Sequence, residues 1–568
     1  MRYQDSVEFT HIHGRGAAMS KVRRSSLVRP EDEITRWLQK EIRKILGKGS
    51  KLPAHCKEDE ITKLLGKGLS DLGGFYRQPD GALWFFRHHN RQLHEVTTHP
   101  DSAFSKYITY VTAQSVKSDL MRRSLDRLHA TMLEEAKIVE VHGIAYNSQD
   151  LAVIAVNDFD GGMWYRQRGG QWEWKPNGGE SILFWTPEVI VQKWVPAFDK
   201  GGTRHAEEAF HWFIEQPHFA EHVLTVKDQR SLLRASLLVP LFPSLNPTRP
   251  VTAHLGLSEE QQHDTGKTMA GKMIGTVWAG AGFEPTPMDS TDKGKEALSL
   301  LLGQAPFVLL DNVDTRTPWL NDYICTYATG QRLTRRKLYS DHTLIHFEPK
   351  ARLCVTSRKA SFNRDDVASR VIPFRFAPIN KAERKTEREL LGLVIDQRGK
   401  IWAGILHVVA RLQDGFPSMQ PYQQTARLAD FDAFGWQVSS IYGEADAWQE
   451  TIVRLEAAQA NFALEDNPFV PILRDWLNQG DIPDMSSSDF FGNLQSRAEE
   501  CEISWGLPRD AASCTKQMKK LRKLLEAELD VTVNFRTLHG RSHIEIRRGH
   551  SWSQPKGEVT GVTGDSLC

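Results

Sequence analysis

The sequence predicts an α/β protein whose central part is a parallel sheet with helices on both faces. Two apolar, uncharged runs support this prediction, Phe307–Leu310 and Leu353–Val355. Such runs are typical of strands that are buried on both sides in a parallel sheet. Each run is followed by polar residues, beginning with Asp311 in the first case and Thr356 in the second. Since ligands bind outside the carboxyl ends of such strands, these polar residues are the first candidates for a site.

A phosphate-binding segment precedes the first of these strands. Thr265-Gly266-Lys267-Thr268 combines a glycine, a lysine and a hydroxyl in the order that binds nucleotide phosphates. We expect all four residues to contact ATP, with Lys267 at the β and γ phosphates. A nucleotide hydrolase also needs a hydroxyl and a carboxylate on magnesium. Thr268 and Asp311 supply them, so the predicted cofactors are ATP and Mg²⁺.

The phosphate loop departs from its usual pattern at one position. The motif G-x-x-x-x-G-K-[ST] has glycine where this chain has Gln261, and glutamine lacks the freedom of glycine at positive φ. A lengthened loop from Ser258 to Thr265, after a strand that ends near Gly256, is one way to accommodate the change. The alternative is that Gly266 begins an ordinary helix of an α/β domain.

A basic stretch lies between the two strands. Four of the six residues from Arg332 to Lys337 are basic, and apolar residues such as Leu338 and Phe347 are suited to anchoring a pair of strands. Positive charge without base-reading groups is what phosphate contacts require. The alternative is a solvated, charged hairpin.

The order of these motifs, from about residue 250 to 443, resembles the AAA+ module of superfamily 3 replicative helicases and their primase-helicase-type relatives in phages, plasmids and integrative elements. The resemblance implies a P-loop AAA+ core that hydrolyses ATP and assembles into a ring, expected to be a homo-hexamer. It also implies that the basic stretch is a hairpin that grips DNA in the central channel through Arg335, Arg336, Lys337 and His342. Lys337 and His342 are expected nearest its tip.

Under this resemblance four residues take part in catalysis: Asp311, Asn312, Thr356 and Arg370. Asp311 belongs to the strand that supplies the metal-binding carboxylate. Thr356, or Ser357 beside it, would orient the attacking water through a hydrogen bond. Arg370 is expected to act in trans as an arginine finger. The alternative is that Arg370 is a salt-bridge partner.

Two positions differ from the pattern of the relatives. Asn312 stands where a second acidic residue is common, and Asp314 is a possible substitute for that acid. Thr356 or Ser357 replaces the usual sensor asparagine. Slow hydrolysis is compatible with both changes, because an amide or a hydroxyl also orients water by hydrogen bonding.

The region near the C-terminus predicts a small domain of winged-helix type. Three helical segments precede two strand-like runs, Val531–Phe535 and His543–Arg547, with His539-Gly540-Arg541 at the turn. The helices are expected at Phe469–Leu477, Ser488–Glu500 and Ala511–Leu525. Between residues 509 and 549 there are ten Lys or Arg against five Asp or Glu, which favours contact with nucleic acid. A protein-docking domain is the alternative.

The predicted organisation has six parts. They are a disordered basic arm (1–29), an N-terminal α+β accessory domain (30–200), a helical collar (205–245), the ATPase with its helical lid (246–445), the winged-helix domain (465–550) and a disordered tail (551–568). Asp158-Phe159-Asp160 has the spacing of a metal-binding acidic pair. We interpret it as turn chemistry, because Gly161-Gly162 follows directly.

Bulk properties narrow the class of protein. A net charge of +1 argues against general attraction to nucleic acid and leaves binding to local basic patches. The six cysteines form no C-x-x-C pair, so neither a zinc ribbon nor a disulfide framework is indicated. No signal peptide or long apolar span is expected, which suits a protein in the cytoplasm of a bacterial host without a membrane partner.

The sequence thus predicts an enzyme, an ATP-dependent DNA helicase or translocase that forms a ring and replicates a phage or other mobile genetic element. The predicted partners are single-stranded DNA in the channel, duplex DNA at an origin, and a primase or replication initiator. Two alternatives stay open. One is an AAA+ ATPase that loads or remodels DNA without unwinding it, and the other is a winged-helix DNA-binding regulator with a degenerate ATPase fold.

Overall fold

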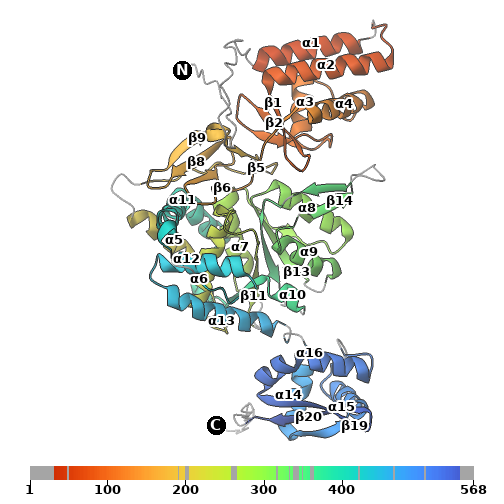
Figure 1. Cartoon of the computed structure of the whole chain (residues 1–568), viewed down its shortest axis with the longest axis vertical. Helices are drawn as coiled ribbons and strands as arrows, with labels where there is room; N and C mark the ends of the chain where they lie inside the picture. Colours follow the sequence, from red (N-terminus) through yellow and green to blue (C-terminus); the bar gives the residue numbers. More distant parts are fainter. Residues whose placement is uncertain are drawn as a thin grey trace, which may run out of the picture.

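The computed structural model shows an elongated molecule with the N-terminal helices at one end and a small C-terminal unit at the other (Figure 1). It describes residues 31–549 except 48–49, 190, 199–203, 258–264, 315–316, 332, 337–343, 348, 358–361, 363, 420–421, 463, 465–466 and 504–506. The predicted arm and tail therefore lie outside the described residues.

The N-terminal unit packs four helices against a four-stranded sheet. Helix α1 buries Ile34, Leu38 and Ile42, which recur at helical spacing and so form one apolar face. The helices are α1 (Glu31–Leu46), α2 (Ala54–Leu72), α3 (Ala103–Thr112) and α4 (Asp119–Glu135). The sheet has the order β3-β2-β1-β4, with β1 (Gly73–Arg77), β2 (Leu83–Arg87), β3 (Leu93–Glu95) and β4 (Lys137–Ile138).

A second antiparallel sheet follows in the same predicted accessory region. It has the order β6-β7-β8-β9, and a short parallel pair joins β5 to β10 beside it. The bounds are β5 (Val141–His142), β6 (Ala145–Asn147), β7 (Val153–Asn157), β8 (Gly162–Gln167), β9 (Glu173–Pro176) and β10 (Leu183–Phe184).

Asp158 closes the turn between β7 and β8. Its fully buried carboxylate accepts hydrogen bonds from the amides of Asp160 (2.8 Å) and Gly162 (2.9 Å) and from the indole N–H of Trp174 (2.8 Å). Lys193 lies 3.2 Å from the same carboxylate. Both oxygens are thus used in holding the turn, which confirms the interpretation of this acidic pair as turn chemistry.

The central sheet is parallel throughout and has the order β12-β13-β16-β11-β17. The two apolar runs recognised in the sequence form β13 and β16, as predicted. The bounds are β11 (Val251–Gly256), β12 (Thr286–Pro287), β13 (Phe307–Val313), β16 (Arg352–Ser357) and β17 (Val371–Phe376). Because β17 follows β16 in sequence but lies beyond β11, the chain crosses the sheet at this point, where α/β sheets bind ligands.

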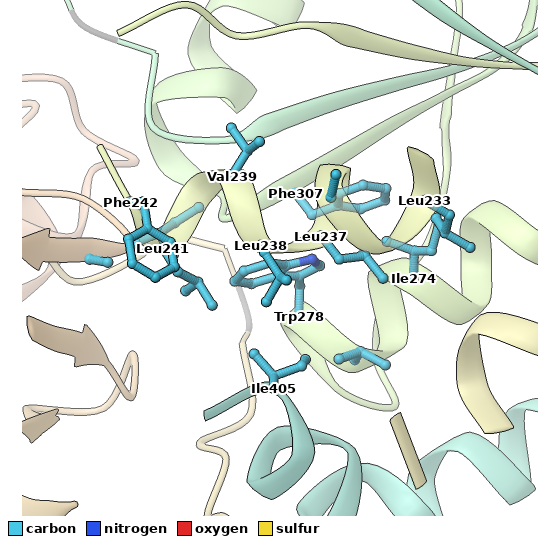
Figure 2. Close-up of a cluster of buried hydrophobic side chains, with 14 of the residues drawn as sticks. Leu233, Leu237, Leu238, Val239, Leu241, Phe242, Ile274, Trp278, Phe307 and Ile405 are labelled. Atoms are coloured by element: carbon cyan, nitrogen blue, oxygen red, sulfur yellow. The ribbon is translucent and has the colours of Figure 1, made fainter. Parts of the chain in front are cut away.

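Helices cover both faces of this sheet, as predicted. In β13, Val308 and Leu310 face one core, with helices α8 (Asp292–Gln304), α9 (Pro318–Ala328) and α10 (Asp365–Ala368). Phe307 and Leu309 face the other core, with α6 (Val226–Leu238) and α7 (Lys267–Ala279). This alternation is the period of two that a strand imposes. Figure 2 shows leucines of α6 close to Ile274 and Trp278 of α7 and to Phe307 of the sheet.

The helices after the sheet pack back on the helices that precede it. The predicted lid helix forms α11 (Glu387–Gly415), followed by α12 (Ala429–Ser440) and α13 (Ala445–Asn461). All three share one hydrophobic core with α6 and with α5 (Arg204–Glu215). The segment expected to be a collar therefore packs into the central unit together with the lid helices.

Arg398 of α11 joins three parts of the central unit. Its guanidinium donates hydrogen bonds to four backbone carbonyl groups, at Val277 (3.0 Å), Trp278 (3.2 Å), Gln192 (2.9 Å) and Lys193 (3.1 Å). The first two belong to the last turn of α7, whose carbonyls lack partners within the helix. Burial lowers the pKa of Arg398 to about 10, so the side chain remains charged at neutral pH.

The C-terminal unit has its own core and the predicted element types. Its elements are α14 (Phe469–Gln479), β18 (Ile482–Ser486), α15 (Ser487–Glu500), α16 (Ala511–Leu529), β19 (Val531–Leu538) and β20 (Arg541–Arg548), and its sheet has the order β18-β20-β19. The three predicted helices and both predicted strands are confirmed. The sequence analysis missed β18, because Ile482-Pro483-Asp484 has no strand pattern. None of the helices in the described part of the chain has the length and apolar character needed to cross a membrane.

We expect Arg398→Met to lower the stability of the central unit by about 3 kcal/mol, since the carbonyls of Trp278, Gln192 and Lys193 lose the donor that Arg398 provides. Methionine retains the apolar part of the side chain, so the loss of stability comes from the missing hydrogen bonds and not from a cavity. The measurement is the unfolding midpoint of the full chain in urea, followed by tryptophan fluorescence. Arg388→Met, at an exposed position of the same helix, is the control. Equal midpoints for the two variants would contradict the role given to Arg398.

Candidate nucleotide site

The carboxyl edge of the parallel sheet brings the predicted metal-binding residues together. The hydroxyl of Thr268, in the first turn of α7, donates a hydrogen bond of 2.7 Å to Oδ1 of Asp311 on β13. The hydroxyl of Thr356 on β16 donates to the same oxygen at 2.6 Å. Three residues from three separate elements thus meet at one carboxylate, and all three were candidates from the sequence.

A local irregularity of β13 holds this cluster in place. The pairing of β13 with β16 shifts between Leu310 and Val313, and Asn312 adopts a left-handed φ of 55°. Asparagine is one of the few residues that tolerate this conformation. The backbone N–H of Asn312 donates to the hydroxyl of Thr356 at 2.8 Å, whereas the side chain of Asn312 is exposed. The Thr356 hydroxyl therefore bridges two successive residues of β13: it accepts from the backbone of Asn312 and donates to the carboxylate of Asp311.

The start of α7 has the geometry of an anion-binding site. Gly266 has a φ of 75°, a left-handed conformation that favours glycine. The helix that follows is 13 residues long, and its first amide groups have no intrahelical acceptor. The ammonium group of Lys267 donates to the carbonyl of Ser357 at 3.2 Å. Gln261 lies outside the described residues.

A buried histidine supports the same helix start. His254 of β11 lies with its Nδ1 3.1 Å from the carbonyl oxygen of Lys267, and 1% of its surface is exposed. Since a carbonyl only accepts, Nδ1 carries the proton and donates. Burial lowers the pKa of His254 to about 4, so the imidazole is neutral near pH 7. The sequence analysis missed this residue, and its one signal was a polar side chain inside the apolar run Val251–Leu255.

These residues fit a magnesium nucleotide. Mg²⁺ keeps several waters and binds proteins through one or two oxygen ligands together with substrate phosphates. Thr268 and Asp311 offer a hydroxyl and a carboxylate side by side. No cluster of three or more His, Cys, Asp or Glu suited to a metal occurs among the described residues. The donor set therefore suits a cation that arrives with phosphates better than one held by protein alone.

Arg370 lies at the opposite edge of the sheet. It directly precedes the six-residue strand β17, whose carboxyl end pairs with the end of β11 near the site. At ~3.3 Å per residue the two edges are roughly 20 Å apart. The guanidinium of Arg370 donates to the carbonyl of Asp366 and lies 3.5 Å from the Cys325 sulfur. This arginine therefore belongs to a different surface from Lys267 and Asp311 of the same chain.

The basic stretch forms an antiparallel hairpin of β14 (Leu333–Arg336) and β15 (Leu344–Phe347). Arg335 and Arg336 lie on β14, and Lys337 and His342 fall outside the described residues. Close to the end of β15, the ammonium group of Lys350 lies 5.3 Å from the ring centre of Trp84 and 5.8 Å from that of Trp185. The root of the hairpin thus contacts the accessory region.

Comparison with known proteins points to replication. Residues 225–448 match the family described as actinomycete integrative conjugative element replication protein. The matched region contains the central sheet, the candidate nucleotide site and the β14–β15 hairpin. The match supports a role in the replication of a mobile element and agrees with the coarser part of the resemblance seen in the sequence. No curated protein matches the chain.

Solved structures align only weakly. The apo structure of the NrS-1 C-terminal region (305–718) has a TM-score of 0.32 at 9% identity and covers 85% of this chain and 97% of its own. An A-form apo structure of the NrS-1 C-terminal region has a TM-score of 0.35 at 9% identity, with 85% and 98% covered. Scores this low carry no argument about fold or activity.

The buried imidazole predicts a pH-dependent stability. In the unfolded chain His254 regains a pKa near ~6.5, so that state binds the proton more readily. Stability should therefore be full above that pH and fall as the pH drops toward 4, by about 2 kcal/mol at pH 5. His254→Asn keeps an N–H donor for the Lys267 carbonyl and cannot titrate. Between pH 7 and pH 5, its free energy of unfolding should therefore fall by about 2 kcal/mol less than that of the wild type. Urea titrations at both pH values measure it.

His55→Asn, at an exposed position of α2, is the matched control and should behave as the wild type. An unchanged acid loss in His254→Asn would show that the imidazole is not the group that titrates.

Proposed function

We propose that this protein is an ATP-dependent DNA helicase or translocase that acts as a ring in the replication of an integrative element. The observation that carries the proposal is the meeting of Thr268, Asp311 and Thr356 at the carboxyl edge of the sheet, beside Lys267 at a helix N-terminus. The family match supports the replication role. The cofactors of this proposal are ATP and Mg²⁺.

Each residue of the cluster has a task in this proposal. The amides at the start of α7 and the Lys267 ammonium bind the β and γ phosphates. Thr268 and Asp311 hold the metal. Bound Mg²⁺ would neutralise the charge that develops on the phosphates. The Thr356 hydroxyl, fixed by the Asn312 amide, lies where it can orient the attacking water.

The position of Arg370 favours an assembly. At roughly 20 Å from the site of its own chain, by the rise of ~3.3 Å per residue, its guanidinium reaches phosphates only in a neighbouring subunit. A head-to-tail arrangement, in which one edge of a sheet meets the opposite edge of the next, forms a ring when the rotation between neighbouring subunits closes. We propose a homo-hexamer with the β14–β15 hairpins in the channel, where Arg335 and Arg336 would contact the phosphates of single-stranded DNA.

The C-terminal unit supports a second DNA contact, with a duplex. Its order of helix, strand, two helices and hairpin resembles that of a winged helix and supports this proposal. On α16, Lys516, Lys519 and Lys523 are exposed, whereas Met518 and Leu525 are buried. One face of the helix is therefore basic and the other anchors it to the core. We propose that the basic face binds duplex phosphates.

A loader or remodeller of the same fold is a second candidate. It is favoured by the absence of a second acid after Asp311, since Asn312 presents an exposed side-chain amide where a carboxylate would polarise water. A strand-displacement assay separates the two functions, because only a helicase releases the displaced strand.

The first test is ATP hydrolysis with and without single-stranded DNA. We expect DNA-stimulated turnover in the wild type and a loss of about 100-fold or more in Lys267→Ala, which removes the positive charge from the phosphates. Lys293→Ala, at an exposed position of α8, should keep full turnover. An active Lys267→Ala protein would refute the assignment of the nucleotide site.

The second test asks whether Arg370 acts across subunits. Lys267→Ala and Arg370→Ala should each be inactive, and mixing them before assembly should restore about a quarter of the wild-type activity, the share of randomly formed interfaces that hold both residues. Lys267→Ala mixed with the double variant Lys267→Ala/Arg370→Ala must stay inactive. Failure of the first mixture to recover activity would remove Arg370 from the composite site.

A further inference from the structure

Helix α1 presents a basic face that the proposed helicase does not use. Arg36, Lys40, Arg43 and Lys44 are all exposed and, at 100° per residue, occupy one side of the helix. They span ~12 Å of its axis at ~1.5 Å per residue. These four residues are called the α1 basic face below.

Among the described residues, carboxylates neutralise little of the charge of this face. Lys44 pairs with Glu41 at 2.7 Å. Within the described part of the chain, Arg36, Lys40 and Arg43 form no ion pair. Like charges four residues apart, as in Arg36 and Lys40 or Lys40 and Lys44, destabilise a helix by ~0.2–0.5 kcal/mol per pair. An anionic ligand along this face would remove the repulsion between these pairs.

An exposed aromatic ring borders the same face. Tyr110 of α3 is 57% exposed, and its ring lies 6.5 Å from that of Tyr107 in a stacked orientation. The side-chain amide of Gln39 donates to the backbone carbonyl of Tyr110 at 3.1 Å. Gln39 lies on α1 beside the basic face, so this bond fixes α3 next to it. An aromatic surface and a row of cations are the two parts of a single-strand binding site.

We propose that the α1 basic face and Tyr110 bind single-stranded DNA, with phosphates along Arg36, Lys40 and Arg43 and an unpaired base on the Tyr110 ring. An unpaired base is required because the bases of a duplex are stacked on one another and cannot reach a side-chain ring. The helix lies at the end of the molecule opposite the C-terminal unit (Figure 1), so this contact is separate from the basic face of α16.

The charge contribution is tested with a triple variant of the full chain, Arg36→Gln/Lys40→Gln/Arg43→Gln. Its binding to a fluorescent oligothymidine is followed by anisotropy over a series of salt concentrations. Since each phosphate contact contributes ~0.7 to the slope of log affinity against log salt for single strands, the slope should fall by about 2. Affinity at low salt should fall at least about 10-fold.

The matched control removes three cations of the same unit that already have carboxylate partners. Lys63, Arg122 and Arg123 pair with Glu60, Asp119 and Glu58 respectively. Lys63→Gln/Arg122→Gln/Arg123→Gln should bind as the wild type does. An equal loss in both triple variants would mean that net charge, not this face, attracts the DNA, and would overturn the proposal.

The tyrosine is tested by crosslinking and by substitution. Irradiation of the wild type with an oligonucleotide containing 5-iododeoxyuridine should give a crosslink at Tyr110, identified by mass spectrometry, and Tyr110→Ala should weaken binding about 10-fold. Thermal melting and DNA-independent ATP hydrolysis, both expected unchanged, verify that the variants fold. A crosslink confined to other segments would contradict the proposal. Equal losses of affinity by the variants for blunt duplex DNA and for polyglutamate would also contradict it, because they would indicate a general surface for polyanions or acidic proteins.

Discussion

The common direction of the five central strands is the constraint on which the candidate site depends. Because the strands are parallel, the carboxyl ends of β13 and β16 and the start of α7 meet at one edge, and that meeting brings Thr268 and Thr356 to Asp311. The same constraint carries Arg370 to the other edge. Under the proposed function, the residues expected to take part in hydrolysis are therefore divided between two surfaces of one chain, and a head-to-tail contact between chains would bring them together.

Much of this site was predictable from the sequence. Strand ends are visible as apolar runs that stop at polar residues, and parallel strands gather those ends, so the contact of Asp311 with Thr268 follows from chain order alone. The contact of His254 with the Lys267 carbonyl does not follow, because it depends on the side of β11 that faces α7. The irregularity at Asn312 was equally invisible, since its left-handed backbone is a response to pairing with β16.

The packing of the helices was harder to predict than their existence. Helix α11 lies in the region predicted to carry a helical lid, yet its Arg398 looks in the sequence like any exposed cation of an amphipathic helix. It is buried because α7 and residues 192–193 present carbonyl groups that only a long planar donor reaches together. The collar was likewise predicted only from its place before the ATPase in the sequence. In space, α5 and α6 share the core of α11–α13.

The contact of Lys350 with Trp84 and Trp185 has a mechanical consequence. A cation held against two aromatic rings contributes about 0.5–2 kcal/mol, which is only a few times the thermal energy. Trp84 and Trp185 also belong to the apolar core that the accessory region shares with the central sheet, so this contact adds a small polar contribution to a junction that is mainly apolar. Loss of the Lys350 charge would therefore weaken the junction only slightly, and the shared core would keep the accessory region packed on the central unit.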